Sequence, residues 1–242
     1  MTVAPTPVPE HRRPHGGRIA ALVVAAVLLV AAGVLLGRSG VFGKSSSSGA
    51  EQGNGTATAQ TRRLPAFGAV ELAGSNLVTV DVGRPQSVVV HADSNLLDHV
   101  VTRVVNGRLV ISDTGSYSTK APMSVAVTVP SLSSVTLSGS GIVTAENVDA
   151  KALTLTLPGS GVLRASGTAD RLDVTLPGSG DAQLAGLVAR DVHAVVSGSG
   201  RILVHPTSSL DASVPGSGAV MYVGNPPHVT SSVTGSGAVV PG

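Results

Sequence analysis

The sequence predicts an all-β chain whose main body is a single-stranded β-helix, or β-solenoid, of two sheets with Gly-Ser-Gly corner turns. Gly-Ser-Gly occurs six times, at steps of 20, 19, 20, 18 and 19 residues, and a fixed period of this size is typical of repeat architectures. Apolar and polar residues alternate around each copy, as they do in strands with one buried face. A long apolar stretch near the N-terminus predicts one transmembrane α-helix ahead of the solenoid.

The composition favours narrow, regular β layers. The 242 residues include two Phe, two Tyr and no Trp, against 30 Gly, so small aliphatic side chains must fill the core. The chain has no cysteine, which excludes a disulfide framework and a thiolate metal site. Residues 61–242 carry eleven basic and twelve acidic side chains. This near-neutral body with almost no aromatic residues gives little support for nucleic-acid binding.

The N-terminal segment predicts a membrane anchor. Residues 1–18 contain four prolines and are expected to form a disordered cytoplasmic arm. A transmembrane helix is expected over residues 19–37, because the eighteen residues from Ile19 to Leu36 carry no charge and span about 27 Å of a hydrocarbon core of about 30 Å. Arginines before this stretch favour a cytoplasmic N-terminus. Residues 38–242 would then lie on the extracytoplasmic side of the cell membrane.

A cleaved signal peptide is the alternative interpretation of this stretch. Its apolar region would be unusually long, and the nearest Ala-x-Ala pattern, Ala57-Thr58-Ala59, lies about twenty residues beyond it. The sequence therefore favours an uncleaved anchor. Residues 38–62 are rich in Ser and Gly and predict a flexible linker to the solenoid.

The solenoid is expected over residues 63–240, with irregular coils over residues 63–137 and six Gly-Ser-Gly coils over residues 138–240. In the irregular part, Asn106-Gly107 between two apolar runs predicts a β-hairpin. The segment from Ser94 to His99 predicts a single helical turn. Alternating or clustered apolar residues predict further strands, at Val70, Leu72, Val78, Val80, Val82, Val88, Val90, Val125, Val127 and Val129.

The six copies align into columns when they are stacked by their glycines. The positions two residues before the first glycine and two residues after the second are apolar in every copy. The position three residues before the first glycine is mostly hydroxylic: Thr136, Thr156, Thr175, Val195, Ser213 and Ser232. Such alternation places one set of side chains in the core and the other in water.

Each repeat is interpreted as one coil, with a strand, a tight turn at Gly-Ser-Gly, a second strand and a looser turn such as Ser166–Asp170 or Pro226–His228. Glycine suits the tight turn because it adopts positive φ without steric cost. Prolines before three of the tripeptides should lie at strand ends. Coils stacked about 4.8 Å apart would share one aliphatic core. A β-propeller is the alternative, but its blades need about forty residues each.

The motifs in this order resemble those of the bacterial family known as putative auto-transporter adhesin, head GIN domain. The resemblance rests on the repeated Ser-Gly-Ser-Gly or Pro-Gly-Ser-Gly units, the approach from Val125 to Leu132, and the segment from Tyr222 to Pro226, and it covers about residues 64–240. It implies a two-sheet β-helical superhelix with the glycine motif at the tight turn. It also implies a role in cell-surface adhesion without an established catalytic site.

Outward positions of the coils supply candidate site residues. Asp173, His193 and Asp211 share the column five residues before the first glycine, so they should form a vertical file with carboxylates about 10 Å apart. Carboxylates at about this spacing serve inverting glycosidases, which makes a polysaccharide-active enzyme the alternative function. Charge alternation that keeps the sheet soluble is the favoured explanation. No catalytic, cofactor-binding or metal residue is assigned.

The remaining polar residues favour structural roles. The serines of the six tripeptides lack a Gly-x-Ser-x-Gly elbow and indicate turns rather than nucleophiles. Asp181 and Arg201 predict a surface ion pair worth under about 1 kcal/mol. Four scattered histidines lack the spacing of metal ligands: His91, His99, His205 and His228.

The sequence as a whole predicts a single-pass membrane protein that displays a non-enzymatic binding, adhesion or structural module at the cell envelope. The membrane and a cell-surface or glycan ligand are the expected partners, and no cofactor is expected. Self-association through exposed terminal coils is a further possibility, because end coils of a solenoid lack one neighbour.

Overall fold

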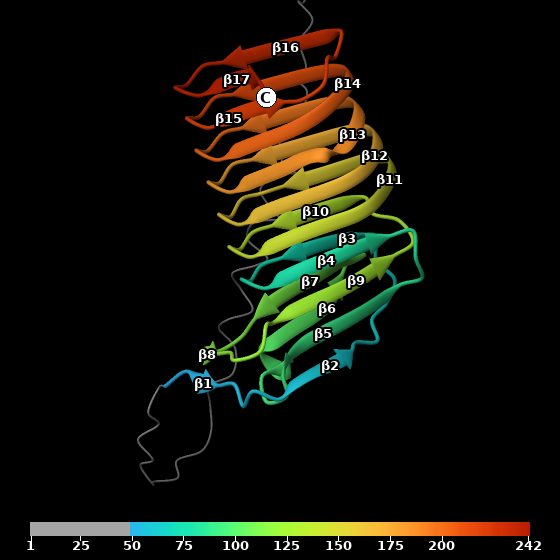
Figure 1. The fold of residues 1–242 in the computed structure, drawn as a ribbon, viewed down its shortest axis with the longest axis vertical. Coiled ribbons are helices and arrows are strands. Elements are labelled where there is room, and N and C mark those ends of the chain that lie inside the picture. Colours follow the sequence, from blue (N-terminus) through green and yellow to red (C-terminus); the bar gives the residue numbers. More distant parts are fainter. Residues whose placement is uncertain (1–48) are drawn as a thin grey trace, which may run out of the picture. The chain divides into compact units, whose positions relative to one another are not determined.

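The computed structural model describes residues 49–242, which form a β-solenoid (Figure 1). The all-β solenoid predicted from the sequence is confirmed. Over these residues, no helix has the length and apolar composition needed to cross a membrane. The arm expected at residues 1–18, the transmembrane helix expected at residues 19–37 and the beginning of the expected linker lie outside the described residues.

Parallel strands stack into two faces that meet at the Gly-Ser-Gly corners. One face carries the strands that enter the corners, and the other carries the strands that leave them. The regular part of the stack contains β10 (Ser134–Leu137), β11 (Ile142–Thr156), β12 (Val162–Leu176), β13 (Asp181–Val196), β14 (Arg201–Val214), β15 (Ala219–Tyr222), β16 (His228–Val233) and β17 (Ala238–Pro241).

The looser turn expected in each coil is absent from the middle of the stack. Each of β11 to β14 runs as one bent strand from one corner to the next, so Ser166–Asp170 lies inside β12. Register shifts mark the bends, for example between Arg164 and Ser166. An irregular loop is retained between β15 and β16, where Pro226-Pro227 interrupts the strand. Bulges thus bend the chain between faces without breaking the ladder.

The N-terminal part closes the lower end of the stack, as drawn in Figure 1. The strand β3 pairs with β10, and β4 pairs with β11, so β3 and β4 form the coil before the first Gly-Ser-Gly. The elements of this part are β1 (Glu51–Gln52), β2 (Ala57–Thr61), β3 (Ala69–Leu72), β4 (Leu77–Val82), β5 (Ser87–Asp93), the 3-10 helix η1 (Leu97–His99), β6 (Val100–Val105), β7 (Arg108–Asp113), β8 (Tyr117–Ser118) and β9 (Ser124–Val129).

Antiparallel pairing ends the parallel stack on both faces. The strand β5 pairs antiparallel with β9 and with β2, and β6 pairs antiparallel with β7. The predicted hairpin is confirmed, with Asn106 and Gly107 at φ values of 50° and 72°. The predicted helical turn is confirmed in η1. Residues 51–52 and 57–61 were expected in the flexible linker over residues 38–62, but they form β1 and β2, which pair with β8 and β5.

The core consists of the aligned apolar columns. The residues two positions before the first glycine are fully buried in five of the six copies, from Leu137 to Val214. The residues two positions after the second glycine are fully buried from Val143 to Val220. The core columns therefore follow the alternation predicted from the sequence. Their side chains become partly exposed only in the last described coil.

The corners need glycine for a reason other than positive φ. None of the twelve glycines of the six tripeptides has positive φ, so the expected conformational explanation is wrong. Instead, a Cβ atom on the first glycine of any copy would lie well under 3.0 Å from a backbone oxygen of the preceding coil. At Gly198, for example, the obstructing atom is the carbonyl oxygen of Gly178. That oxygen also accepts a hydrogen bond from the Ser199 amide at 3.2 Å.

A seventh corner lies at Gly74-Ser75-Asn76. The Gly74 carbonyl accepts a hydrogen bond from the Gly141 amide at 3.3 Å, and the Asn76 carbonyl accepts one from Ile142 at 3.1 Å. Within residues 49–242 no corner precedes it, and the Asp113 carboxylate lies against Gly74 where the other corners meet the backbone of a preceding coil. Asp113 accepts hydrogen bonds from the Ser75 amide at 2.9 Å and from the Asn76 side chain.

A buried carboxylate fixes the first strands to the domain. Asp93 is fully buried and accepts hydrogen bonds from the amides of Gly55 at 2.8 Å and Lys120 at 2.9 Å. The Ala121 amide and the Thr119 hydroxyl also donate to it. These donors, led by the Lys120 amide, lower the pKa of Asp93.

Replacing a corner glycine should destabilise the solenoid. We expect Gly198→Ala to lower the free energy of unfolding by at least about 2 kcal/mol, because the new methyl group meets the backbone of the preceding coil. Ser199→Ala in the same corner should change it by less than about 0.5 kcal/mol, because the Ser199 side chain is exposed. Urea unfolding measures both. Equal stability of the two variants would contradict the steric explanation.

Asp93→Asn should remove a pH-dependent contribution to stability. Because the pKa of Asp93 is lowered on folding, its contribution is complete above the unfolded pKa of about 3.9 and is lost as the pH falls through the folded value. The wild type should therefore be more stable than Asp93→Asn at pH 7, with a difference that shrinks below about pH 4. Urea midpoints at several pH values measure this difference, with the exposed Asp149→Asn as control. A difference that stays constant down to pH 2 would rule out the carboxylate as its source.

Candidate functional site

The file predicted at Asp173, His193 and Asp211 forms in register. Asp173 pairs with His193 in the ladder between β12 and β13, and His193 pairs with Asp211 in the ladder between β13 and β14. The Nδ1 atom of His193 lies 3.1 Å from Oδ2 of Asp211. Asp173 accepts three hydrogen bonds from Arg171, two of them 3.0 Å long and one 3.3 Å long. The three residues are thus neighbours, but Asp173 is held by an arginine that the sequence analysis did not consider.

A second outward column lies beside this file. Arg171, Asp191 and Ser209 are aligned two residues before the first column. The Ser209 hydroxyl donates to Asp191 at 2.7 Å, and Arg190 forms an ion pair with the same carboxylate at 2.9 Å. The hydrogen bond from Ser209, followed by that from Arg190, lowers the pKa of Asp191. The period of two along the strands could have revealed this column in the sequence.

The two columns surround a shallow hollow of about 200 Å³ that does not suit acid–base catalysis. A glycosidase needs a carboxylic acid whose pKa is raised. Here the pKa of Asp191 is lowered, and the carboxylate of Asp173 is engaged by Arg171. Among the described residues, no Phe, Tyr or Trp side chain on which a sugar ring could stack lines the hollow. The paired charges instead form an ordered polar surface.

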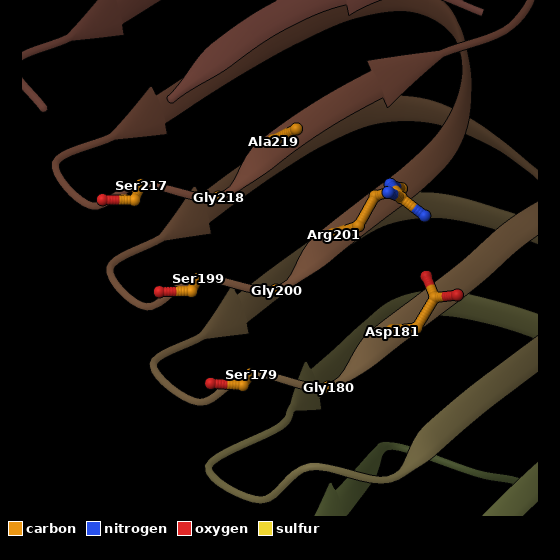
Figure 2. A pocket seen from close by; sticks show the side chains of 9 residues that line it. All are labelled: Ser179, Gly180, Asp181, Ser199, Gly200, Arg201, Ser217, Gly218 and Ala219. Atoms are coloured by element: carbon orange, nitrogen blue, oxygen red, sulfur yellow. The ribbon is translucent and has the colours of Figure 1, made fainter. Parts of the chain in front are cut away.

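A larger hollow of about 270 Å³ lies beside three successive corners. Figure 2 shows Ser179, Ser199 and Ser217 one above another, with hydroxyls that point away from the strands. Asp181 and Arg201 rise from the adjacent strands. The expected ion pair between them is not formed. Asp181 instead accepts a hydrogen bond from Gln183 at 2.8 Å.

The corner hollow continues into an apolar one. A second hollow of about 390 Å³ shares Asp181 and Arg201 and is otherwise lined by Gln183, Leu203 and Met221. Leu203 and Met221 are partners in the ladder between β14 and β15. The outward face after the corners therefore presents hydroxyl, charged and apolar groups side by side.

The histidines occupy separate places. His99 lies at the N-terminal end, with Nε2 2.9 Å from Glu51 and Nδ1 2.6 Å from the Thr114 carbonyl. The hydrogen bond with Glu51 raises the pKa of His99, and it lowers the pKa of Glu51. His205 contacts the Ala185 carbonyl at 3.2 Å. Within residues 49–242, no three His, Asp or Glu side chains gather as metal ligands.

Solved structures with the same fold come from Bacteroides and Parabacteroides species. A putative adhesin from Bacteroides fragilis is 20% identical, with a TM-score of 0.65 over 78% of this chain and 99% of the other. A putative adhesin from Parabacteroides distasonis is 19% identical, with a TM-score of 0.54 over 80% and 100%. A putative lipid binding protein from the same species is 21% identical, with a TM-score of 0.51 over 79% and 98%. At these identities the likeness establishes the fold alone.

The sequence comparisons identify the family. None of the curated proteins matches this chain. The family model described as "Putative auto-transporter adhesin, head GIN domain" matches residues 66–226, which include six of the seven corners. The family resemblance found in the sequence is therefore confirmed by the family match, and the β-helical fold that it implies is found in the structure. The chain belongs to the putative auto-transporter adhesin, head GIN domain family.

Proposed function

We propose that this protein is a single-pass membrane protein that displays its solenoid outside the cell as a non-enzymatic adhesion module for cell-surface glycans. The apolar run from Ile19 to Leu36 and the basic residues before it support the anchor and its orientation. The Ser- and Gly-rich residues that follow support a flexible linker that holds the solenoid away from the membrane. The family match supports an adhesive role.

The corner hollow is the observation that carries the binding role. Three hydroxyls repeat there at the ladder spacing of about 4.8 Å, beside the carboxylate of Asp181. Among the described residues, the Arg201 guanidinium makes no hydrogen bond or ion pair with another side chain. A regular file of donors and acceptors with an available cation suits a polar, repeating polymer, and glycans have this character.

The binding surface should depend on the two charged residues of the corner hollow. We expect Asp181→Ala/Arg201→Ala to weaken binding to the recognised glycan at least about tenfold, because charge-assisted hydrogen bonds contribute about 1.5–3 kcal/mol. Cells that display the full chain would be assayed on a panel of envelope and host glycans. Arg103→Ala, an exposed position on β6, is the matched control. If the double variant binds glycans as strongly as the wild type, the corner hollow is not the binding site.

The same panel separates adhesion from catalysis. The enzymatic alternative would use Asp173, His193 and Asp211, where Nδ1 of His193 lies 3.1 Å from Asp211. Asp173→Asn tests this alternative. Under the adhesion proposal, bound glycans are recovered uncleaved from wild type and variant alike. Glycan cleavage by the wild type that Asp173→Asn abolishes would replace adhesion with a polysaccharide-active enzyme.

The orientation of the chain has its own test. We expect protease added to intact cells to remove a tag placed after Gly242, because the proposal puts residues 38–242 outside the membrane. Permeabilised cells show that the tag itself is cleavable. A tag that is lost only after permeabilisation would place the solenoid inside the cell.

A further inference from the structure

The two ends of the solenoid differ in how the core is covered. At the C-terminal end, the core columns finish in Val229 and Val233 of β16, each 43% exposed. Their ladder partners one coil below, Leu210 and Val214, are 1% and 0% exposed. These two valines therefore point into the core, but no described segment covers them. They are core residues at an open end, unlike isolated apolar residues on a surface.

The N-terminal end is closed by comparison. Phe67, Leu96 and Leu132 are buried in the part of the chain where strands pair antiparallel. Arg63 and Arg103 are exposed there. Charged side chains on an outer strand oppose edge-to-edge pairing.

The C-terminal edge lacks these protective features. The strand β16 pairs only with β14, and β17 pairs only with β15, so each has one free edge in the described structure. No residue from Val229 to Gly242 carries a charge, and β16 contains no proline. An uncharged strand with an unpaired edge is a template for pairing with another strand.

We propose that the C-terminal coil binds the C-terminal coil of a second copy of this chain about a two-fold axis. A second copy fits because the edge meets an identical edge, and two uncharged edges approach without repulsion. The N-terminal end is closed and carries exposed arginines, so it does not suit pairing with the C-terminal coil. The contact therefore joins the C-terminal ends of both copies. The same contact covers the open core and satisfies the free backbone groups of β16.

The alternation within β16 fixes the pairing. Antiparallel pairing that keeps core positions on one face centres on Ser231, with Val229 opposite Val233 of the second copy. Thr230 then lies opposite Ser232 of the second copy on the outer face, where hydroxyl pairs are favourable. Both exposed valines of each copy become buried in one junction.

This pairing has a consequence for adhesion that rests on the proposed display at the cell surface. Residue Gly49 leads into β1 at the closed end, and the chain reaches its last coil at the opposite end (Figure 1). A junction of two open ends therefore directs the two N-terminal tethers away from each other. Copies anchored in two facing membranes satisfy this geometry, so the protein joins cells that display the same protein.

The oligomeric state of the full chain in detergent is the first test. We expect a dimer for the wild type and a monomer for Val233→Lys, because the lysine places like charges in the junction. Val105→Lys is the matched control, since Val105 is 47% exposed on β6 at the closed end. It should remain dimeric. A monomeric wild type, a dimeric Val233→Lys or a monomeric Val105→Lys would each overturn the proposal.

Cysteine cross-linking locates the junction independently, because the natural chain has no cysteine. Ser231→Cys should form an intermolecular disulfide under mild oxidation, since it meets its own copy across the two-fold axis. Gln60→Cys, exposed on β2 at the closed end, should stay monomeric on a non-reducing gel. Cross-linking of Gln60→Cys without cross-linking of Ser231→Cys would overturn the junction.

Mixed cell populations test contact between cells. Two differently labelled populations that display the wild type should aggregate, whereas a Val233→Lys population should not join them. Dimers in detergent without mixed aggregates would overturn the bridging of cells while leaving the junction intact. A tag that is protected from protease on intact cells would instead overturn surface display, so the two failures are distinguishable.

Discussion

The close approach of backbones at the corners is the constraint on which the rest of the solenoid depends. Within a strand, Cβ atoms point into the core or into water, so coils can stack at the ladder spacing of about 4.8 Å. At the corner the Cα–Cβ direction of both glycines turns toward the coil before. Only a residue without Cβ lets the carbonyl of Gly178 approach Gly198 while it accepts the hydrogen bond of Ser199. The tripeptide therefore sets the spacing of coils rather than the shape of a turn.

The corners fix the register, and the opposite bends absorb differences in length. The strand β13 has 16 residues and β14 has 14, yet both begin and end at aligned corners. The shifts that reconcile them fall between Gln183 and Val188 and between Ala189 and Asp191. Core columns and outward columns stay aligned on both sides of these bends. Variation in sequence therefore falls on the bends and outward columns, where a ligand can reach it.

The sequence predicted the parts of the fold that repeat, because each repeat tests the same pattern again. Alternation around the corners was enough to find the core and the file of Asp173, His193 and Asp211. The prediction that the corners need glycine for its positive φ was wrong. The actual reason is a contact between successive coils, which cannot be inferred from the sequence of a single repeat. Non-repeating contacts were missed as well: Asp113 completes a corner with Asn76 in place of glycine, and Asp93 holds strands that read as linker. The Arg171 contact with Asp173 was missed because its two residues belong to adjacent outward columns.

Stacking also explains why the last coil differs energetically from the others. Ordering a coil costs roughly 1.5 kcal/mol per residue, and an isolated coil recovers too little of this by burying apolar side chains. Interior coils gain a neighbour on both sides, and the first coil gains the antiparallel strands below it. Among residues 49–242, the coil of β16 and β17 has one neighbouring coil, and Val229 and Val233 are half exposed. A second copy would supply the missing neighbour, so association through this end completes the folding of the coil that forms it.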